Sequence, residues 1–367
     1  MFTREDLESL LDYRPQAPVL SVYLNTNPAE RTADDYKLQL RSLLKDIDMA
    51  DDVEAVREYF EYEYDWTGHR SAVVFSCVQK DFFQSIPLAV DVRNQAYVQD
   101  QPYIKPLASL FDSFSGYGVI LVDQQKARFF SFHLGDLEGE EEFSGQDVQR
   151  QKHGGGSQTT GRRSGDAGDA EYADTVSDRN LREASKHANK FLKKHDVRRV
   201  LIGGTEKNIS SFREYLTKSW QSLIVGTFPM EMSASYSEVQ KRALKIGKEA
   251  EEKRKQKLIE TVITEAAKGR NGLLRFDEIL SAVREGRVQT LLVQEGFIQP
   301  GYQCDGCGYI TTQELGSCPF CSDTFQRIDD AVEMVVREVL QAGGSVEVLD
   351  SNEALESHGG IGALLRY

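Results

Sequence analysis

Apolar positions along the chain alternate in some segments and follow a helical period in others, and this pattern predicts strands mixed with helices. Up to residue 112, a helix is expected at EDLESLL after the cap Thr3, a strand at PVLSVYLNT and a helix at YKLQLRSLLKDI. Further strands are expected at 72–77, 82–88 and 95–98. Two prolines in QPYIKPLASLF make this tail a predicted connection.

A second stretch, 113–235, again mixes both periods. GVILVDQQKARFFSFHLGDLEGEEEF predicts two strands joined at the DQQK turn and a third strand, and an almost entirely polar loop follows at 147–176. Behind the loop come a predicted helix (DRNLREASKHANKFLKKH), a strand (RRVLIGG), a helix (ISSFREYL) and a strand (LIVGTF). This alternation predicts a sheet covered by helices.

The last stretch, 236–367, begins with a long charged helix that ends at Gly269. The helix FDEILSAVREG, the strand VQTLLVQ, a cysteine-containing segment, the helix DDAVEMVVREVLQAGG and the strand SVEVLD follow. The predicted fold class is therefore α/β, with three mixed domains at 1–112, 113–235 and 236–367. A length of 367 residues fits several domains of ordinary size.

Charge and cysteine content restrict the function. The net charge of −14 argues against a surface that binds nucleic acid all round, but 148–164 carries only basic charges, including Arg150. The longest apolar runs are much shorter than the roughly 20 residues of a membrane helix. Four of the five cysteines cluster within eighteen residues, and no secretory pattern opens the chain. We therefore expect a cytoplasmic protein without a membrane segment.

The clustered cysteines are the clearest chemical pattern. Cys304, Cys307, Cys318 and Cys321 follow the spacing Cys-x2-Cys-x10-Cys-x2-Cys. Each pair can form a turn that presents two thiolates, and two turns can complete a tetrahedron around Zn²⁺. Two disulfides or four free thiols are the alternatives, and paired knuckles favour the metal. Because four thiolates leave no open position for a substrate, we predict a structural Zn²⁺ in a ribbon at 302–321.

The second pattern is the glycine-rich sequence KHGGGSQTTGRRSG. Glycines allow the backbone to approach a ligand where a Cβ would collide, and arginines offer phosphate contacts. The alternative is an untethered surface loop, because Gly/Ser-rich stretches are usually flexible linkers. The candidate RNA-binding residues are Lys152, His153, Gly154, Gly155, Gly156, Ser157, Arg162 and Arg163.

Other charged residues have weaker functional interpretations. His187 and His195 lie on the predicted helix after the loop, together with four lysines, and this helix either touches RNA or is simply solvated. Asp123 follows a predicted strand, as nuclease carboxylates do, but no second and third carboxylate can be placed beside it. The basic helix at 241–257 either lies along RNA or bridges domains through ion pairs between successive turns.

The order of these motifs resembles the archaeo-eukaryotic class-one release factor and pelota superfamily, in particular its bacterial members. The motifs are SVYLNT, GVILVDQQKARFFSF followed by an acidic stretch, the glycine-rich loop, the inserted cysteine ribbon and GGIGALLRY. The resemblance spans about residues 17–367. It implies a three-domain factor in the ribosomal A site, with the first domain facing the decoding centre, the middle domain reaching the peptidyl-transferase centre and the last contacting the stalk side.

The glycine-rich loop departs from the motif of the family's release factors. Those factors use a Gly-Gly-Gln triplet to help water attack the peptidyl-tRNA ester, and this triplet is absent here. The run 154–158 is similar instead to the Gly-Gly-x-Ser-Gln variant of bacterial homologues and the Gly-Ser-Gln of Vms-type peptidyl-tRNA hydrolases. Neither an Asn-Ile-Lys-Ser nor a Tyr-x-Cys-x-x-x-Phe segment for stop-codon recognition is present. Codon-specific termination is therefore disfavoured.

Three hypotheses follow from the sequence. The first is a factor that occupies idle or stalled ribosomes under stress, as Balon-type hibernation factors do. The second is a ribosome-dependent peptidyl-tRNA hydrolase in which Gln158 is catalytic and orients a water, since glutamine is no general base at neutral pH. The third is a protein-binding adaptor with a disordered loop. The partners implied by the resemblance are ribosomal RNA, P-site tRNA and an elongation-type GTPase.

Overall fold

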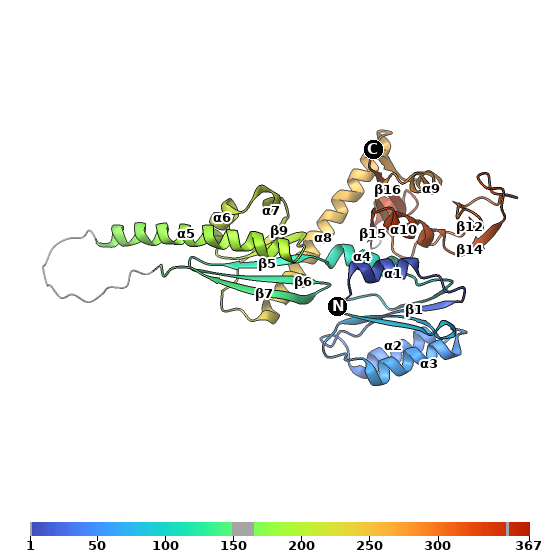
Figure 1. Cartoon of the computed structure of the whole chain (residues 1–367), viewed down its shortest axis with the longest axis horizontal. Helices are drawn as coiled ribbons and strands as arrows, with labels where there is room; N and C mark the ends of the chain where they lie inside the picture. Colours follow the sequence, from blue (N-terminus) through green and yellow to red (C-terminus); the bar gives the residue numbers. More distant parts are fainter. Residues whose placement is uncertain (1, 149–164, 350–351) are drawn as a thin grey trace. The chain divides into compact units, whose positions relative to one another are not determined.

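The computed structural model describes residues 2–148, 165–349 and 352–367 (Figure 1). The described chain divides into two compact units. The middle unit is Phe114–Glu252, and the composite unit combines Met1–Ser113 with Lys253–Tyr367. The mixed α/β fold class is confirmed. The division into three domains stays a prediction, because the composite unit contains both the first and the last expected domain, each with a sheet of its own.

The first part of the composite unit is an antiparallel sheet of order β3-β2-β1-β4. Its strands are β1 (Val19–Asn25), β2 (Ser71–Cys77), β3 (Phe82–Leu88) and β4 (Gln95–Gln99). Helix α1 (Arg4–Asp12) begins at the expected cap, Thr3, which forms a capping box with Asp6. Helices α2 (Ala33–Leu44) and α3 (Ala50–Glu58) and the π-helical turn η1 (Tyr59–Glu63) pack an apolar face on the sheet. The sequence analysis missed α3 and η1.

The last part of the composite unit is a second sheet of order β10-β16-β11-β15. Its strands are β10 (Gly272–Leu273), β11 (Val288–Gln294), β15 (Ser345–Leu349) and β16 (Ile361–Leu365). Helices α9 (Phe276–Arg284) and α10 (Ala331–Gln341) share its core, and α11 (Glu353–Glu356) precedes β16. A separate small sheet of order β13-β12-β14 lies between β11 and α10 in the chain and carries the four clustered cysteines. Its strands are β12 (Gly301–Cys304), β13 (Ile310–Thr311) and β14 (Phe325–Ile328).

Buried charges on α10 join the two parts of the composite unit. The guanidinium of Arg337, only 1% exposed, donates hydrogen bonds to the carbonyl oxygens of Leu11, at 2.8 Å, and Pro102. Its Nε lies 3.3 Å from Oε1 of Glu333, which also accepts from the N–H of Ile104 at 3.1 Å. A helix leaves its last carbonyls without intrahelical donors, so Arg337 supplies the missing partner at the end of α1.

Burial and a neighbouring ion pair set the electrostatics of this junction. Desolvation raises the pKa of the fully buried Glu333 carboxyl to about 7, although the charges of Arg337 and Lys105 oppose it. Lys105 is itself buried, donates to the carbonyl of Phe297 at 3.1 Å and lies 3.4 Å from a carboxylate oxygen of Asp330. The junction is therefore a polar network inside a protein core, where removing one partner is expensive.

The middle unit is a five-stranded mixed sheet of order β7-β6-β5-β8-β9. Its strands are β5 (Tyr117–Val122), β6 (Lys126–His133), β7 (Asp136–Ser144), β8 (Arg199–Gly204) and β9 (Ile224–Phe228). Successive residues of β5 point to opposite faces, and both faces are covered. Ile120 and Val122 pack with α5 (Gly165–Lys194) and α6 (Glu206–Tyr215), whereas Val119 and Leu121 share a cluster with residues at the start of α8 (Tyr236–Ala267).

Two further helices and one helix boundary differ from the sequence-based expectation. The predicted connection after residue 101 contains helix α4 (Lys105–Phe114), whose Pro106 occupies the first turn, where no intrahelical N–H is needed. Helix α5 begins at Gly165, so the expected glycine-rich loop at 147–176 is wrong in its last twelve residues. The short helix α7 (Lys218–Ser222) was not expected. No helix in the described part of the chain has the length and hydropathy of a membrane span.

Candidate functional site

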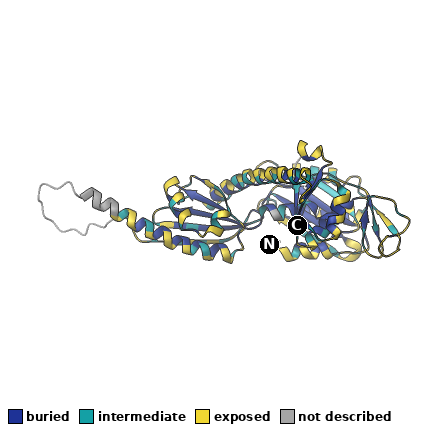
Figure 2. Ribbon diagram, turned by 90° about the horizontal axis from the view of Figure 1, so that it is seen from above, coloured by how far each residue is buried: buried dark blue, intermediate teal, exposed yellow. Residues whose placement is uncertain are grey.

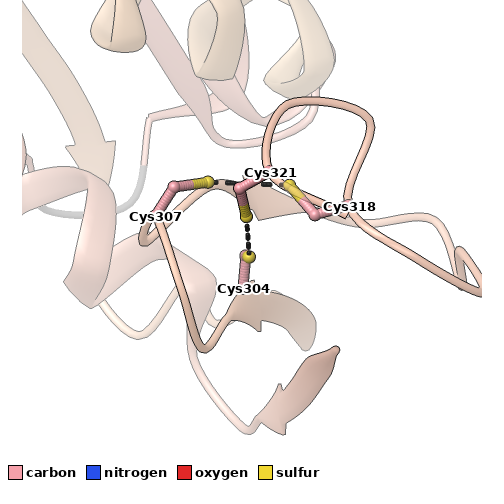
Figure 3. Close-up of side chains that lie close together, drawn as sticks. All are labelled: Cys304, Cys307, Cys318 and Cys321. Carbon is pink, nitrogen blue, oxygen red and sulfur yellow. Dashed lines mark hydrogen bonds between the residues drawn. The ribbon is translucent and has the colours of Figure 1, made fainter. Parts of the chain in front are cut away.

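The four cysteines converge at one end of the small sheet (Figure 3). The sheet consists of β12 (Gly301–Cys304), β13 (Ile310–Thr311) and β14 (Phe325–Ile328). All four sulfur atoms lie within 4.8 Å of one another. The Sγ atoms of Cys304 and Cys321 are 3.3 Å apart, and those of Cys307 and Cys318 are 3.6 Å apart. Both distances exceed a disulfide bond of about 2.05 Å and approach the roughly 3.8 Å edge of a tetrahedral zinc–thiolate site.

The two knuckles have the same backbone conformation. The N–H of Gly308 donates to the carbonyl of Cys304 at 3.0 Å, and the N–H of Ser322 donates to the carbonyl of Cys318 at 2.9 Å. In each knuckle the residue after the second cysteine is left-handed, with φ of 71° at Gly308 and 66° at Ser322. Each turn thus directs its two thiols toward those of the other, which is how paired Cys-x2-Cys knuckles bind a metal.

The thiols also differ in acidity. Desolvation raises the pKa of Cys318, but hydrogen bonds from the backbone of Phe320 and Cys321 outweigh it and lower this pKa to about 6. A backbone bond at Asp323 lowers the pKa of Cys321, yet the bonds to neighbouring thiols raise it to about 12. One thiolate forms readily, and further thiolates next to it need a cation. The donor set therefore fits a metal ion held by four sulfur ligands.

Side chains at both ends of helix α9 contact the ribbon. The guanidinium of Arg284 lies 3.3 Å from the ring centroid of Phe320 and 4.9 Å from that of Tyr309. Phe320 belongs to the second knuckle and is 58% exposed. At the other end of α9, Thr312 donates to Asp277 at 2.8 Å. The cysteine ribbon is thus attached to helix α9 by contacts outside the four cysteines.

The candidate residues of the glycine-rich loop, 152–163, lie outside the described residues, whereas Gly145 and Gln146, just before the loop, contact a side chain of α5. The buried side chain of Asn180 on α5 accepts from the N–H of Gln146 at 2.9 Å and donates to its carbonyl at 2.8 Å. The same amide donates to the carbonyl of Gln124, in the β5–β6 turn, at 3.1 Å. At Gly145 a Cβ would collide with the Asn180 side chain. Asn180 therefore ties three segments together where the loop leaves the sheet.

Asp123 lies in the same turn and has a structural role. Its Oδ1 accepts from the backbone N–H groups of Gln125, at 2.7 Å, and Lys126, at 2.5 Å. This is the pattern of an aspartate that stabilises a tight turn. The structure therefore gives no support to a nuclease site at this strand end.

The two helix histidines are engaged with the acidic strand β7. His187 lies 2.8 Å from Glu141, whose pKa is lowered by Lys194 first and by His187. His195 packs over the strand at Gly139, where a Cβ would collide with the imidazole ring, and its Nδ1 lies 3.7 Å from Glu138. These contacts bind α5 to β7, so the histidines serve the fold of the middle unit.

Comparison with known proteins shows a similarity to translation release factors. Residues 102–248, which include nearly all of the middle unit, match the family model "Bacterial archaeo-eukaryotic release factor family 10". A curated relative, peptide chain release factor subunit 1 of Methanocaldococcus jannaschii, is 22% identical over 294 residues, which cover 72% of this chain and 69% of that protein. Over residues 102–248 the chain is therefore similar to bacterial members of the archaeo-eukaryotic release factors, a group of translation factors.

Solved structures of this superfamily are similar only at low scores. An archaeal translation termination factor is 15% identical with a TM-score of 0.28, over 98% of this chain and 96% of that chain. The Saccharomyces cerevisiae protein Dom34, described as a translation termination-like factor that interacts with Hbs1, is 11% identical with a TM-score of 0.43, over 83% and 81%. An archaeal Pelota described as ribosome-bound is 14% identical with a TM-score of 0.41, over 100% and 94%.

The four cysteines could be predicted from the sequence, whereas Asn180 could not. A cysteine pair is visible because its spacing is fixed by local turn geometry. Asn180 lies inside a predicted helix among polar neighbours, and its partners at 124 and 146 are far away in sequence. Its helical position was the only available signal, since it falls on the same face as Leu181, Ala184 and Ala188, which are buried.

Proposed function

We propose that this protein binds the ribosomal A site of idle or stalled ribosomes and protects them, as a hibernation factor. The match of residues 102–248 to a release factor family carries this proposal, because it covers the unit from which the glycine-rich segment extends. The absence of the Gly-Gly-Gln triplet from the sequence favours occupancy over peptide release. The cytoplasm, where ribosomes translate, is the proposed location.

The proposed arrangement on the ribosome follows the family pattern. Residues 1–112 would face the decoding centre, and 236–367 would contact the stalk side. The segment 152–163 would reach the peptidyl-transferase centre, with Lys152, Arg162 and Arg163 at RNA phosphates. Asn180 supports this assignment because it fixes the base of that segment between two structural elements. P-site tRNA and an elongation-type GTPase are proposed further partners.

We also propose that the metal is zinc and that its role is structural. Cys304, Cys307, Cys318 and Cys321 would hold it with all four coordination positions filled, so it would stabilise the ribbon without contacting a substrate. The attachment of Phe320 and Tyr309 to Arg284 would then position the ribbon on its domain.

A second candidate function is ribosome-dependent hydrolysis of peptidyl-tRNA. The observation that favours it is the sequence Gly-Gly-Gly-Ser-Gln at 154–158, which keeps a glutamine directly behind a glycine-rich run. The amide of Gln158 would orient a water toward the ester carbonyl, and the RNA would supply the remaining catalytic environment.

One pair of measurements separates the two functions. Purified ribosomes carrying P-site peptidyl-tRNA are incubated with the wild-type protein, the Gln158→Ala variant or the matched Gln151→Ala control, and released peptide is counted. Hibernation predicts no release above background together with stable cosedimentation of the protein with vacant ribosomes. Hydrolysis predicts release that Gln158→Ala abolishes and Gln151→Ala retains. Absence of the protein from ribosomal fractions after starvation or cold shock would contradict both functions.

A further inference from the structure

We propose that the solvent-facing side of α5 is a docking surface for the phosphate backbone of RNA. This surface, the α5 basic stripe, consists of residues at positions i, i+3, i+7, i+11 and i+14 of one helix: Arg179, Arg182, Lys186, Lys190 and Lys193. At 3.6 residues per turn these positions stay within a narrow arc of the helix and extend over about 21 Å. The proposal rests on the proposed function, since the ribosome supplies the RNA.

The opposite side of α5 fixes the orientation of the stripe. Its apolar residues pack in the core between the helix and the sheet: Leu181, Ala184, Ala188, Phe191 and Leu192 are all buried. Figure 2 shows exposed and buried positions alternating along this helix. Because burial of that apolar face holds the helix against rotation, the five basic side chains are presented to solvent together.

The stripe stands out against the charge of the whole chain. Between Arg179 and Lys194 there are six lysines and arginines and one acidic residue, Glu183, in a protein of net charge −14. Self-repulsion of such a row costs stability in the free protein, so a polyanion that neutralises it binds favourably. RNA fits better than an acidic peptide because its phosphates repeat along a regular backbone. The distance between successive phosphates is close to the rise of one turn of an α-helix.

Internal ion pairs leave the stripe available. Lys186 contacts Glu183 at 2.9 Å, and Arg182 contacts Asp178 at 3.4 Å, but all four side chains are about half exposed or more. Exposed pairs of this kind contribute only about 0–1 kcal/mol and exchange readily for a phosphate. Lys190 and Lys193 are exposed and form no ion pair within the described part of the chain.

A second basic helix shows what distinguishes α5. The first half of α8 presents Lys241, Lys245 and Lys248 at the spacing i, i+4 and i+7, the same spacing as Lys186, Lys190 and Lys193. On α8, however, Glu238 and Glu252 fall on the same helical face as the lysines. Two carboxylates thus interrupt the positive field of the α8 row, whereas the same face of α5 carries one, Glu183.

This pair of helices provides a matched experiment. The triple variant K186Q/K190Q/K193Q and the control K241Q/K245Q/K248Q remove the same charge at the same helical spacing. Binding of the wild-type protein and of each variant to vacant ribosomes and to a short naked RNA duplex is measured between about 50 and 300 mM KCl. Phosphate contacts weaken over this range of salt. Circular dichroism checks that both variants fold.

The α5 variant is expected to lose roughly 10- to 100-fold in affinity at about 0.1 M salt, and the slope of log K against log[KCl] should fall in magnitude by about 2 to 3. The control variant should keep most of the wild-type affinity and most of the wild-type salt dependence. Equal losses in the two variants would show an effect of net charge alone and overturn the proposal, as would an α5 variant that binds like wild type. If the wild-type protein does not bind ribosomes, and of the two variants only the α5 variant binds the duplex more weakly, the hibernation function is contradicted and the docking surface is supported.

Discussion

Replacing Arg337 with methionine should release α1 from the composite unit. Methionine keeps much of the aliphatic stem and removes the guanidinium. The carbonyls of Leu11 and Pro102 then lose their donor, and the carboxyl of Glu333 loses the cation 3.3 Å away. Breaking a buried ion pair on one side costs about 3–5 kcal/mol, which includes the groups left without partners. We therefore expect R337M to reduce the free energy that holds α1 in place by about 3–5 kcal/mol.

Hydrogen exchange is the appropriate assay, because a single unfolding free energy is poorly defined for a chain with two compact units. The amides of Arg4–Asp12 and of 103–105 should exchange roughly 100- to 4000-fold faster in R337M, since each 1.4 kcal/mol is about tenfold. Amides of the middle unit should be unchanged and serve as the internal reference.

A second variant tests whether the charge is the cause. Glu333→Gln keeps an oxygen that can accept from the N–H of Ile104 and cannot ionise. In R337M/E333Q the buried carboxylate is gone, so part of the loss should be recovered as a positive coupling in the double-mutant cycle. Protection of α1 that stays at its wild-type level in R337M would refute the role assigned to Arg337.

The remaining predictions concern the acidity of Glu333 and two other sites. Because burial raises the pKa of Glu333 to about 7, from 4.5, the folded state retains a proton that the unfolded chain releases. Stability of the composite unit should fall by about 3 kcal/mol as pH rises between these values, and urea denaturation of Glu333→Gln should lack this fall. Asn180→Ala should lower the stability of the middle unit by about 2–3 kcal/mol. Asn180→Asp should lower it by more, since a carboxylate would face two carbonyl oxygens. A higher melting temperature for the Asp variant than for the Ala variant would contradict this. Cys318→Ser should reduce bound zinc in elemental analysis, whereas Cys77→Ser, in β2, should retain it; equal zinc in both variants would exclude the four-cysteine site.

The sequence predicted those parts of the fold that depend on local periodicity. The strands β1, β2 and β3 and helices such as α9 and α10 each carry their own apolar pattern, and Thr3 was recognisable as a cap. The start of α5 was not predictable in this way, because 165–175 contains few large apolar residues from which a helical period can be detected. Helix α4 was missed because Pro106, which breaks helix interiors, is tolerated in a first turn.

Features that depend on distant residues could not be predicted. Arg337 and Glu333 lie one turn apart and suggest an exposed helix pair, yet both are buried because α1 and residues 101–105 cover them. The same applies to Asp123, whose position at a strand end suggested catalysis, whereas its hydrogen bonds show a turn. In each case the partner that determines the role is decided by tertiary packing.

The composite unit is built from both ends of the chain, and this has a consequence during synthesis. Arg337 follows its partner Leu11 by 326 residues, so at about 5–20 residues per second the end of α1 waits roughly 15–65 s for its donor. During that time the carbonyls of Leu10 and Leu11 lack their donor on α10. The nascent N-terminal part is therefore a candidate for chaperone protection, and a chain truncated before α10 would lack the contacts that complete this unit.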